Sequence, residues 1–352
     1  MRLFPPYIVR NAQVFYSHEF LFHHNTEATS NGILADMGSL SYKVPGITEI
    51  EDASKRIEKI IHHTPVLSNS SINNITGASI FFKCENLQRG GAFKIRGASN
   101  AILSHTRENR IKGVTTHSSG NHAQAVAIVA KSLNIPAYMV MPSNTAAVKK
   151  QAVAGYGGDI VECEPTLQAR ESKVKEVIEN TGALFIHPYN NYDIIAGQAT
   201  ACRELLEEIR DPDYILAPVG GGGLLSGTAL SANYFSPGSS VIGCEPKGAD
   251  DAFRSMQANR IIPSINPKTI ADGLLTSLGE KTFDIIRNHV EEILTVEDEL
   301  ILAAMKLYWE RMKLVVEPSG AITLAVILKE KQRFKNKRVA IIISGGNVQF
   351  PY

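Results

Sequence analysis

The stretch GVTTHSSGNHAQAVAIVAKSLNIPAYMVMP, residues 113–142, reads as a strand, a loop, a helix and a second strand. Short apolar runs at 114–116 and 137–140 favour strands, and the alanine- and valine-rich run 121–133 between them favours a helix. Strands that alternate with helices in this way indicate a parallel sheet covered by helices. The stretch therefore predicts an α/β fold.

The same alternation continues on both sides of this unit. Further helices are predicted at 147–154, 167–179, 197–209, 224–234 and 250–259. Further strands are predicted at 159–161, 184–186, 215–218, 241–244 and 339–343. Upstream, the sequence predicts a helix over 50–61, a strand at 80–82 and a helix over 94–103, and residues 283–316 read as mostly helical. These elements predict open parallel sheets with helices on both faces.

This order of elements predicts two domains. Residues 43–112 and 191–352 form a large domain, and residues 113–190 form a small domain inserted in it. A cleft between two such domains is a common place for a ligand. Residues 1–42 are predicted to be a poorly ordered extension, rich in aromatic residues. A targeting segment and a start at Met37 are the alternatives for this extension.

The composition excludes several function classes. The 352 residues carry a net charge of +1 at pH 7 with dispersed lysines and arginines, so no nucleic-acid partner is predicted. The uncharged stretch 214–244 is rich in glycine and serine, unlike the long apolar run of a membrane helix. Four widely spaced cysteines give neither a zinc motif nor a disulfide framework. We expect free thiols and a cytoplasmic protein.

Lys94 lies in the first of four segments that carry chemistry, GGAFKIRG, residues 90–97. Glycines flank the lysine where a loop meets a helix. A lysine that is partly desolvated in such a place has a lowered pKa and a free amine, which a Schiff base requires. Taken alone, an exposed lysine in a glycine-rich turn is the simpler interpretation.

The second segment, THSSGNH at 116–122, falls where a strand ends and a helix begins. The unpaired N–H groups and the positive dipole end of a helix N-terminus suit a substrate carboxylate. Helix capping by serine and asparagine is the simpler alternative. A serine–histidine hydrolase is a competing interpretation, weakened because no G-x-S-x-G elbow surrounds these serines.

The third and fourth segments each follow an apolar strand. In VGGGGLLSG, residues 219–227, four glycines precede a helix, so their N–H groups suit one phosphate. A dinucleotide is disfavoured because Ser226 stands at the third glycine position of the fingerprint. In ISGGN, residues 343–347, a serine hydroxyl at a strand end suits a ring nitrogen. Plain turns explain each segment when it is taken alone.

Together and in this order, the four segments resemble those of the fold-type II pyridoxal-phosphate (PLP) enzymes, the family of the tryptophan synthase β subunit and the serine/threonine dehydratases. The resemblance covers residues 47–347 and is strongest to eukaryotic serine racemases, including the plant form. It implies an enzyme, an isomerase and lyase, that interconverts L- and D-serine and eliminates serine to pyruvate and ammonia. Two alternatives stay open. One is an ammonia-lyase of L-threonine, L-serine or threo-3-hydroxyaspartate without useful racemisation, and the other is a non-catalytic amino-acid or phosphate-binding protein.

The resemblance also assigns site residues. It implies that Lys94 forms the Schiff base with the cofactor and that Ser119 is the acid–base group on the opposite face, which racemisation requires. Dehydratases of the family carry alanine at the position of Ser119. The residues implied at the cofactor are Phe93, Lys94, Asn121, Gly220, Gly221, Gly222, Gly223, Leu224 and Ser344. Those implied at the substrate are Ser118, Ser119, Gly120, Asn121, His122 and Arg170, the last acting at domain closure.

A divalent metal site, an effector and a second subunit are implied as well. Glu245 and Asp251 would supply carboxylates and Ala249 a backbone carbonyl, and oxygen ligands suit Mg²⁺, Ca²⁺ or Mn²⁺. ATP is implied as an effector between the subunits of a homodimer. The chain ends soon after Asn347, where relatives usually continue, and no regulatory domain follows the core. Isoleucine feedback is therefore not expected.

Overall fold

A computed structural model of the chain describes residues 43–106 and 111–349. The predicted extension 1–42, including the alternatives of a targeting segment and a start at Met37, lies outside the described residues. Across the described ranges, no helix is both long enough and apolar enough to span a membrane.

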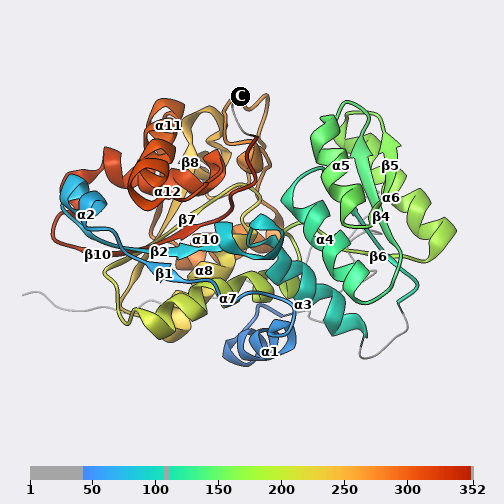
Figure 1. Cartoon of the computed structure of the whole chain (residues 1–352), viewed down its shortest axis with the longest axis horizontal. Coiled ribbons are helices and arrows are strands. Elements are labelled where there is room, and N and C mark those ends of the chain that lie inside the picture. Colours follow the sequence, from blue (N-terminus) through green and yellow to red (C-terminus); the bar gives the residue numbers. More distant parts are fainter. Residues whose placement is uncertain (1–42, 107–110, 350–352) are drawn as a thin grey trace, which may run out of the picture. The chain divides into compact units, whose positions relative to one another are not determined.

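The larger sheet has six strands in the order β1-β2-β10-β7-β8-β9 (Figure 1). Its strands are β1 (Val66–Leu67), β2 (Ser79–Cys84), β7 (Tyr214–Pro218), β8 (Ser240–Pro246), β9 (Glu292–Val296) and β10 (Arg338–Ile343). All neighbours pair in parallel except β1, which runs antiparallel to β2 at one edge. In a parallel sheet the carboxyl ends of all strands lie along one edge, so the loops that follow them converge.

The smaller sheet has four strands in the order β5-β4-β3-β6, all parallel. Its strands are β3 (Val114–His117), β4 (Ala137–Pro142), β5 (Asp159–Cys163) and β6 (Leu184–Phe185). The helices between them are α4 (Asn121–Ser132), α5 (Ala147–Gly155) and α6 (Leu167–Thr181) (Figure 1). The α/β prediction from residues 113–142 is confirmed, whereas the domain boundaries 113 and 190 stay a prediction.

Helices cover both faces of the larger sheet, as the alternating side chains of β10 show. Ile341 and Ile343 pack in one core with α11 (Asp298–Leu307) and α12 (Pro318–Lys329). Ala340 and Ile342 point the other way and pack with α7 (Tyr192–Glu208), α8 (Gly223–Phe235) and α10 (Glu280–His289). Successive side chains of a strand point to opposite faces, so an apolar run such as Val339–Ile343 requires burial on both sides.

The remaining helices complete these layers. They are α1 (Ile47–Ile57), α2 (Ser70–Thr76), α3 (Lys94–Thr106), α9 (Asp251–Ala258) and α13 (Lys331–Phe334). Short 3-10 turns lie at Glu85–Leu87, Arg89–Gly91, Lys247–Ala249 and Asp272–Leu274, and one π turn lies at Tyr308–Met312. Helix α3 also contributes Ile95 and Ile102 to the core that α4 and the smaller sheet share. Helix α3, which begins with Lys94, therefore packs in the same core as the smaller sheet.

Three of the predicted elements were wrong in extent. The region 283–316 is not continuously helical, because β9 (Glu292–Val296) pairs with β8 and its β-branched residues favour a strand. Helix α1 ends at Ile57 rather than at residue 61. Helix α7 begins at Tyr192 rather than at residue 197, because the Asn191 side chain accepts a hydrogen bond from the Ile194 N–H at 3.0 Å and caps it.

Candidate active site

Lys94 is positioned by a loop that is hydrogen-bonded to the end of strand β10. The Phe93 N–H donates to the Ser344 carbonyl at 3.0 Å, and Ala92 forms an isolated antiparallel bridge with Gly345. Gly90 and Gly91 both have positive φ, of 76° and 72°, which explains why glycines stand there. The predicted cofactor residues Phe93, Lys94 and Ser344 are thus brought together at the carboxyl edge of the larger sheet.

The amine of Lys94 has the environment that a reactive lysine needs. Its Nζ donates to the carbonyl of Pro188 at 3.0 Å and lies 5.2 Å from the centre of the Phe93 ring. Burial lowers the pKa of Lys94 to about 8, and the nearby Glu317 carboxylate opposes that fall. With this pKa, about a tenth of the amine is neutral at pH 7 and about half at pH 8, and the neutral amine is able to act as a nucleophile.

A buried charge cluster anchors the first turn of α3 behind Lys94. Arg96 is 0% exposed and donates to Glu85 Oε2 at 2.7 Å and to Glu204 Oε1 at 2.7 Å. Lys83, also 0% exposed, donates to Glu204 Oε2 at 2.7 Å. Two acids and two bases balance each other, so each buried charge has partners. The cluster fixes the helix start that carries Lys94.

Asn121 belongs to a polar network that the sequence did not reveal. Its side-chain N–H₂ donates to both oxygens of Glu317, at 3.0 and 3.1 Å, and its Oδ1 accepts from Asn347 at 2.9 Å. Burial raises the pKa of Glu317 to about 7. Glu317 is the N-cap of α12, and the Glu-Pro pair indicates a helix start but not the burial of the acid.

The loop after β7 consists of glycines because neighbouring groups occupy the space that a side chain would need. A Cβ on Gly221 would lie 2.3 Å from the Tyr189 ring, and one on Gly220 would lie 2.9 Å from the Leu274 backbone. Gly222 has φ of 88°, and Gly223 begins α8 with Leu224 beside it. Bare N–H groups at a helix N-terminus form a cradle that fits a phosphate.

The loop Ser118–Gly120 leads into α4, with Gly120 as its N-cap. The Gly120 N–H donates to Ser118 Oγ at 3.4 Å, and no heavy atom lies within 4 Å of a Cβ placed on Gly120. The loop therefore offers free space at a helix N-terminus, next to Asn121. Ser119 stands in this open segment.

Comparison with known proteins assigns the chain to the family that its four sequence segments resemble. The sequence matches the family described as pyridoxal-phosphate dependent enzymes over residues 57–345. The chain belongs to this family. It is 50% identical to a serine racemase of Dictyostelium discoideum over 306 residues, which are 86% of this chain and 94% of that protein. It is 46% identical to a β-hydroxyaspartate dehydratase of Paracoccus denitrificans over 305 residues, 87% and 97% of the two chains.

A solved structure has the same fold. Maize serine racemase superposes with a TM-score of 0.85 at 45% identity, covering 88% of this chain and 95% of the other. The predicted fold-type II architecture of the PLP family is confirmed.

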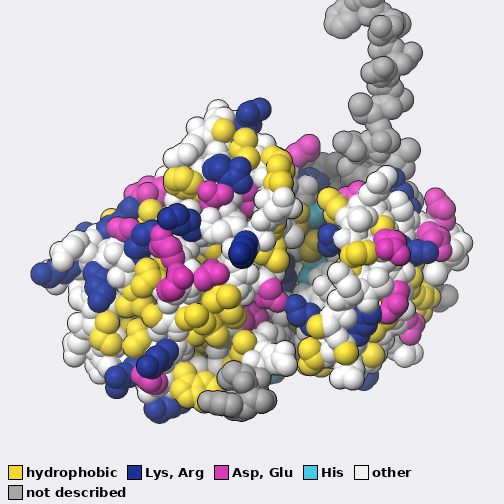
Figure 2. Space-filling view, turned by 90° about the horizontal axis from the view of Figure 1, so that it is seen from above, with side chains coloured by type: hydrophobic (Ala, Val, Ile, Leu, Met, Phe, Trp, Pro, Cys, Tyr) yellow, Lys and Arg dark blue, Asp and Glu magenta, His cyan; other side chains and the backbone are white. Residues whose placement is uncertain are grey.

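Three histidines of this PLP enzyme, His117, His122 and His187, lie close to one another, and the charge of Lys94 acts on His122 and His187. His117 stacks on Phe185 with ring centres 5.4 Å apart and lies 6.1 Å from His187, and His187 meets Tyr189 at 4.8 Å. Figure 2 shows histidine side chains in a hollow of the molecular surface. The His187 Nδ1 accepts from the Tyr189 and Asn190 N–H groups, which shapes the turn after Pro188. Sequence reasoning found no signal for this turn.

His122 is held inside the protein and does not pair with a serine. It is 2% exposed, its Nε2 is bonded to the Ile186 carbonyl at 3.1 Å, and its Nδ1 has no hydrogen-bond partner. Burial, with a contribution from Lys94, lowers the pKa of His122 to about 3. The competing interpretation of a serine–histidine hydrolase is wrong, because a general-base histidine must bond its nucleophile.

Arg170 lies on α6, with its Nε 3.4 Å from the Thr166 carbonyl. Its positive charge helps to lower the pKa of His117, after burial, which places the guanidinium on the histidine side of the site. The same charge acts on Tyr189, which contacts the glycine loop. These effects indicate that the Arg170 charge lies near His117 and Tyr189, and its role at the substrate stays a prediction.

Glu245, near the end of β8, and Asp251, the first residue of α9, form a buried pair of carboxylates. Each residue is 1% exposed. Glu245 accepts from the Ala252 and Phe253 N–H groups at 2.8 Å, and both oxygens of Asp251 have no hydrogen-bond partner. Burial raises the pKa of Glu245 to about 8 and that of Asp251 to about 6. Orphaned buried carboxylate oxygens are what a bound cation would satisfy, so these residues fit the predicted metal site.

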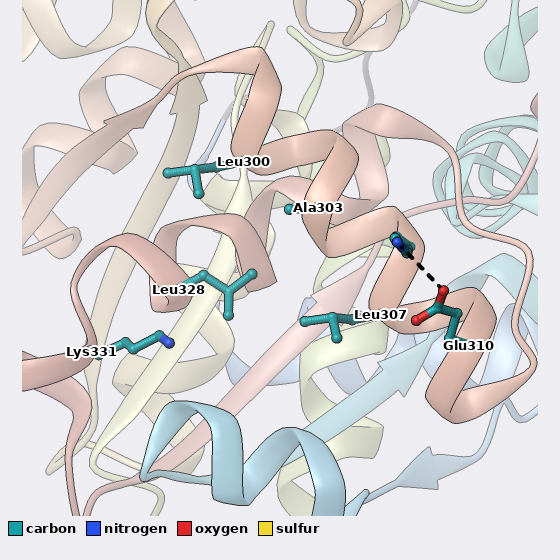
Figure 3. A pocket seen from close by; sticks show the side chains of 7 residues that line it. Leu300, Ala303, Leu307, Glu310, Leu328 and Lys331 are labelled. Carbon is teal, nitrogen blue, oxygen red and sulfur yellow. Dashed lines mark ion pairs between the residues drawn. The ribbon is translucent and has the colours of Figure 1, made fainter.

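A separate groove of about 380 Å³ lies between α11 and α12, and none of the predicted site residues lines it (Figure 3). Its floor is apolar and consists of Leu300, Ala303, Leu307 and Leu328. The groove is therefore distinct from the candidate active site.

Proposed function

We propose that the enzyme interconverts L- and D-serine and also eliminates serine to pyruvate and ammonia. The observation that carries the proposal is the buried Lys94 amine, with a pKa of about 8, which donates to the Pro188 carbonyl and is acted on by the charge of Glu317, the partner of Asn121. The serine racemases of Dictyostelium and maize, at 50% and 45% identity, support the choice of serine as substrate.

The residues present fit pyridoxal phosphate. The bare loop Gly220–Gly223 with Leu224 would hold the phosphate, Ser344 would face the ring nitrogen and Asn121 the ring hydroxyl. Phe93 lies beside Lys94, which would hold the aldehyde carbon covalently. When bound, the cofactor supplies an electron sink that weakens the Cα–H bond of an attached amino acid.

Different protein groups would bind the substrate carboxylate and transfer the α-proton. The loop N–H groups of Ser118–His122, at the start of α4, would hold the carboxylate, with Arg170 approaching from α6. The Lys94 amine would remove or return the α-proton on one face. Ser119 Oγ would do the same on the other face, so the proton can be returned with inverted stereochemistry.

Ser344 would favour these outcomes over amino-group transfer. It is 2% exposed and carries no charge. Its neutral hydroxyl would hold the ring nitrogen of a bound cofactor without donating a full proton to it, and return of the α-proton or loss of a β-hydroxyl as water would then be favoured.

The second candidate is an ammonia-lyase of L-threonine, L-serine or threo-3-hydroxyaspartate without useful racemisation. The 46% identity to the Paracoccus β-hydroxyaspartate dehydratase supports it. A non-catalytic binding protein on the same fold is the third. Purified protein should be incubated with each amino acid while keto acid and D-serine are measured by chiral chromatography.

The three candidates give different results in this assay. D-serine together with pyruvate supports the proposal, and keto acid without D-serine would establish the ammonia-lyase instead. If no product forms and no cofactor absorption band depends on Lys94, the result would favour a non-catalytic binding protein.

A divalent cation is proposed at Glu245, Asp251 and the Ala249 carbonyl. The donor set is carboxylate and carbonyl oxygen, which suits Mg²⁺, Ca²⁺ or Mn²⁺. It lies at the end of β8, next to the glycine loop strand β7. The proposed role of this cation is to stabilise the turn before α9, and it would not contact the substrate.

A homodimer is proposed with ATP as an effector between its subunits. Leu87, Val315 and Val348 are 46%, 48% and 39% exposed. The Asn86 side chain donates to the Val315 carbonyl at 3.1 Å, which brings two of these segments together. An exposed apolar patch of this kind suits a protein partner.

The four free cysteines support our expectation of a reducing, cytoplasmic location.

A further inference from the structure

Ser264 lies beside the carboxylate of Asp251, in the loop that follows α9. This loop folds back on the first turn of the helix, because Ser255 Oγ donates to the Asp251 carbonyl at 2.6 Å and accepts from the Ile262 N–H at 2.8 Å. Burial raises the pKa of Asp251 to about 6, and the Ser264 hydroxyl is the group that most opposes this rise. The side chains of Ser264 and Asp251 are therefore neighbours.

Three buried oxygens at this place have no hydrogen-bond partner among the residues that the structure describes. They are the Oγ of Ser264 and both carboxylate oxygens of Asp251. Buried polar atoms are costly when they stay unpaired, so a group that binds all three is indicated. A direct hydrogen bond from Ser264 would satisfy one oxygen of Asp251 and leave the other unpaired. A cation can bind the hydroxyl and the carboxylate together.

A divalent cation at Glu245 and Asp251 needs neutral oxygens besides these two carboxylates. Within residues 43–106 and 111–349, no group of three or more histidine, cysteine, aspartate or glutamate side chains could hold a metal ion. Mg²⁺ and Ca²⁺ take about six oxygen ligands or more. A serine or threonine hydroxyl binds Mg²⁺ in the phosphate-binding loops of nucleotide enzymes. The Ser264 hydroxyl, next to Asp251, has the chemistry that such a site still needs.

The backbone of Ser264 points to the glycine loop through a second serine. Its N–H donates to Ser277 Oγ at 2.8 Å. Ser277 belongs to the segment 272–282, which packs against the loop Gly220–Gly223: a Cβ on Gly220 would lie 2.9 Å from the Leu274 backbone, and the Thr282 hydroxyl donates to the Gly221 carbonyl at 2.8 Å. Ser264 therefore lies between the carboxylates and the support of the glycine loop.

We propose that Ser264 Oγ is a further ligand of the cation, and that Ser264 connects the cation to the glycine loop through Ser277. This inference rests on the cation site of the proposed function. A cation that holds the Ser264 hydroxyl also fixes its backbone N–H, and with it Ser277 and the segment 272–282. The cation and the cofactor phosphate therefore favour each other's binding without sharing a ligand.

Calorimetric titration of the metal-stripped enzyme with Mg²⁺ and with Zn²⁺ tests the ligand role. In Ser264→Ala the affinity for both metals should fall by about tenfold or more. In Ser264→Cys the affinity for Mg²⁺ should also fall, whereas that for Zn²⁺ should rise about tenfold, because a thiolate suits Zn²⁺ and not Mg²⁺. Ser68→Cys should match the parent with both metals, since Ser68 is exposed after β1 and three strands separate β1 from β8.

The outcomes separate this inference from the proposed function. Mg²⁺ affinity that is unchanged in Ser264→Ala, a fall for both metals in Ser264→Cys, or a rise for Zn²⁺ that Ser68→Cys shares would each overturn the ligand role. A parent enzyme that binds no Mg²⁺ would instead contradict the cation site itself, and this inference with it.

The connection to the glycine loop is tested by cofactor binding. The holoenzyme is dialysed to equilibrium at graded cofactor concentrations, with Mg²⁺ or with EDTA, and the cofactor absorption band is measured. Mg²⁺ should raise the cofactor affinity of the parent by about fivefold or more. Ser277→Ala should bind Mg²⁺ as the parent does and lose this gain. A gain that persists in Ser277→Ala, or none in the parent, would overturn the connection.

Discussion

The side-chain amide of Asn121 donates to both carboxylate oxygens of Glu317, at 3.0 and 3.1 Å, although 196 positions separate the two residues. This pairing matters for Lys94, because the Glu317 charge raises the pKa of the lysine against the effect of burial. Glu317→Gln should therefore lower the pKa of Lys94 below its value of about 8.

The measurement is the pH dependence of Lys94 labelling by an amine-reactive ester in cofactor-free protein, read by mass spectrometry. Glu317→Asp, which keeps the charge, serves as the control and should leave the labelling curve near that of the parent. A curve that does not move in Glu317→Gln would contradict the assigned role.

Local patterns predicted the parts of the site that lie within single segments. Lys94 between glycines, the loop Gly220–Gly223 and Ser344 each stand where a strand or helix begins or ends, and backbone geometry puts chemistry there. Glu317 was missed because its role depends on Asn121, which is remote in sequence, and pairings of this kind follow from packing alone.

The same limit applies to the fold. Strand β9 (Glu292–Val296) was read as helix, since its five residues lack a clear polar and apolar alternation and lie between two helical stretches, and its strand form depends on pairing with β8. The alternation of strands and helices in residues 113–142 predicted its sheet because the 12-residue apolar helix α4 and the apolar strand β4 follow the short strand β3 in a regular order.

Ser119→Ala should abolish racemisation and spare elimination. Removal of one positioned acid–base group costs about 100- to 10,000-fold, so D-serine formation should fall by at least about 100-fold. Pyruvate formation from L-serine should change by only a few fold, because Lys94 serves that face. Chiral chromatography of both products checks this, with Ser118→Ala expected to weaken both reactions together. Equal loss of both products in Ser119→Ala would remove Ser119 from its role.

Without a bound cation, Glu245 and Asp251 should make the protein less stable as pH rises. Both carboxyls have a raised pKa in the folded state, about 8 and about 6. Their contribution to the free energy of unfolding is fully present below the pKa values that they have in the unfolded chain. It is lost as pH rises through the pKa values that they have in the folded protein. In EDTA, the contribution of these two carboxyls to the melting temperature should therefore fall between about pH 4 and pH 8. Other titrating groups add their own pH dependence to the measured value.

Mg²⁺ should reverse this fall, because a cation favours the ionised carboxylates. The comparison is the melting temperature at pH 8 with EDTA and with Mg²⁺, in the parent and in Asp251→Asn. Asp250→Asn is the matched control, since Asp250 pairs with Arg254 at 2.7 Å instead. A Mg²⁺ effect that persists in Asp251→Asn would place the cation elsewhere.

His122 should make the protein less stable in acid. Its pKa falls to about 3 in the folded state, so the unfolded chain binds a proton that the folded one rejects. Its stabilising contribution is present above the unfolded value of about 6.5 and is lost as pH falls below it. Between pH 7 and pH 5 the loss is about 2 kcal/mol for this one group.

The variant His122→Asn isolates that contribution. Urea unfolding at pH 7 and pH 5 should show a smaller change in the free energy of unfolding in the variant than in the parent. His289→Asn, a substitution of a histidine outside the cluster, should behave as the parent does. Equal pH dependence in parent and His122→Asn would show that the ring is not held neutral.

Glu204 should contribute more to stability than an ordinary surface acid, because two buried cations depend on it. Its Oε2 accepts from Lys83 at 2.7 Å and from Arg96 at 2.8 Å. Glu204→Gln would leave Arg96 with one acid, Glu85, and would remove the acid that pairs with Lys83, and removing one partner of a buried ion pair costs about 3–5 kcal/mol. Glu207→Gln on the same helix breaks only an exposed pair with Arg203 and should cost less than about 1 kcal/mol. Urea unfolding of both variants at pH 7 checks the contrast, and similar losses in the two would mean that the buried cluster does not anchor α3.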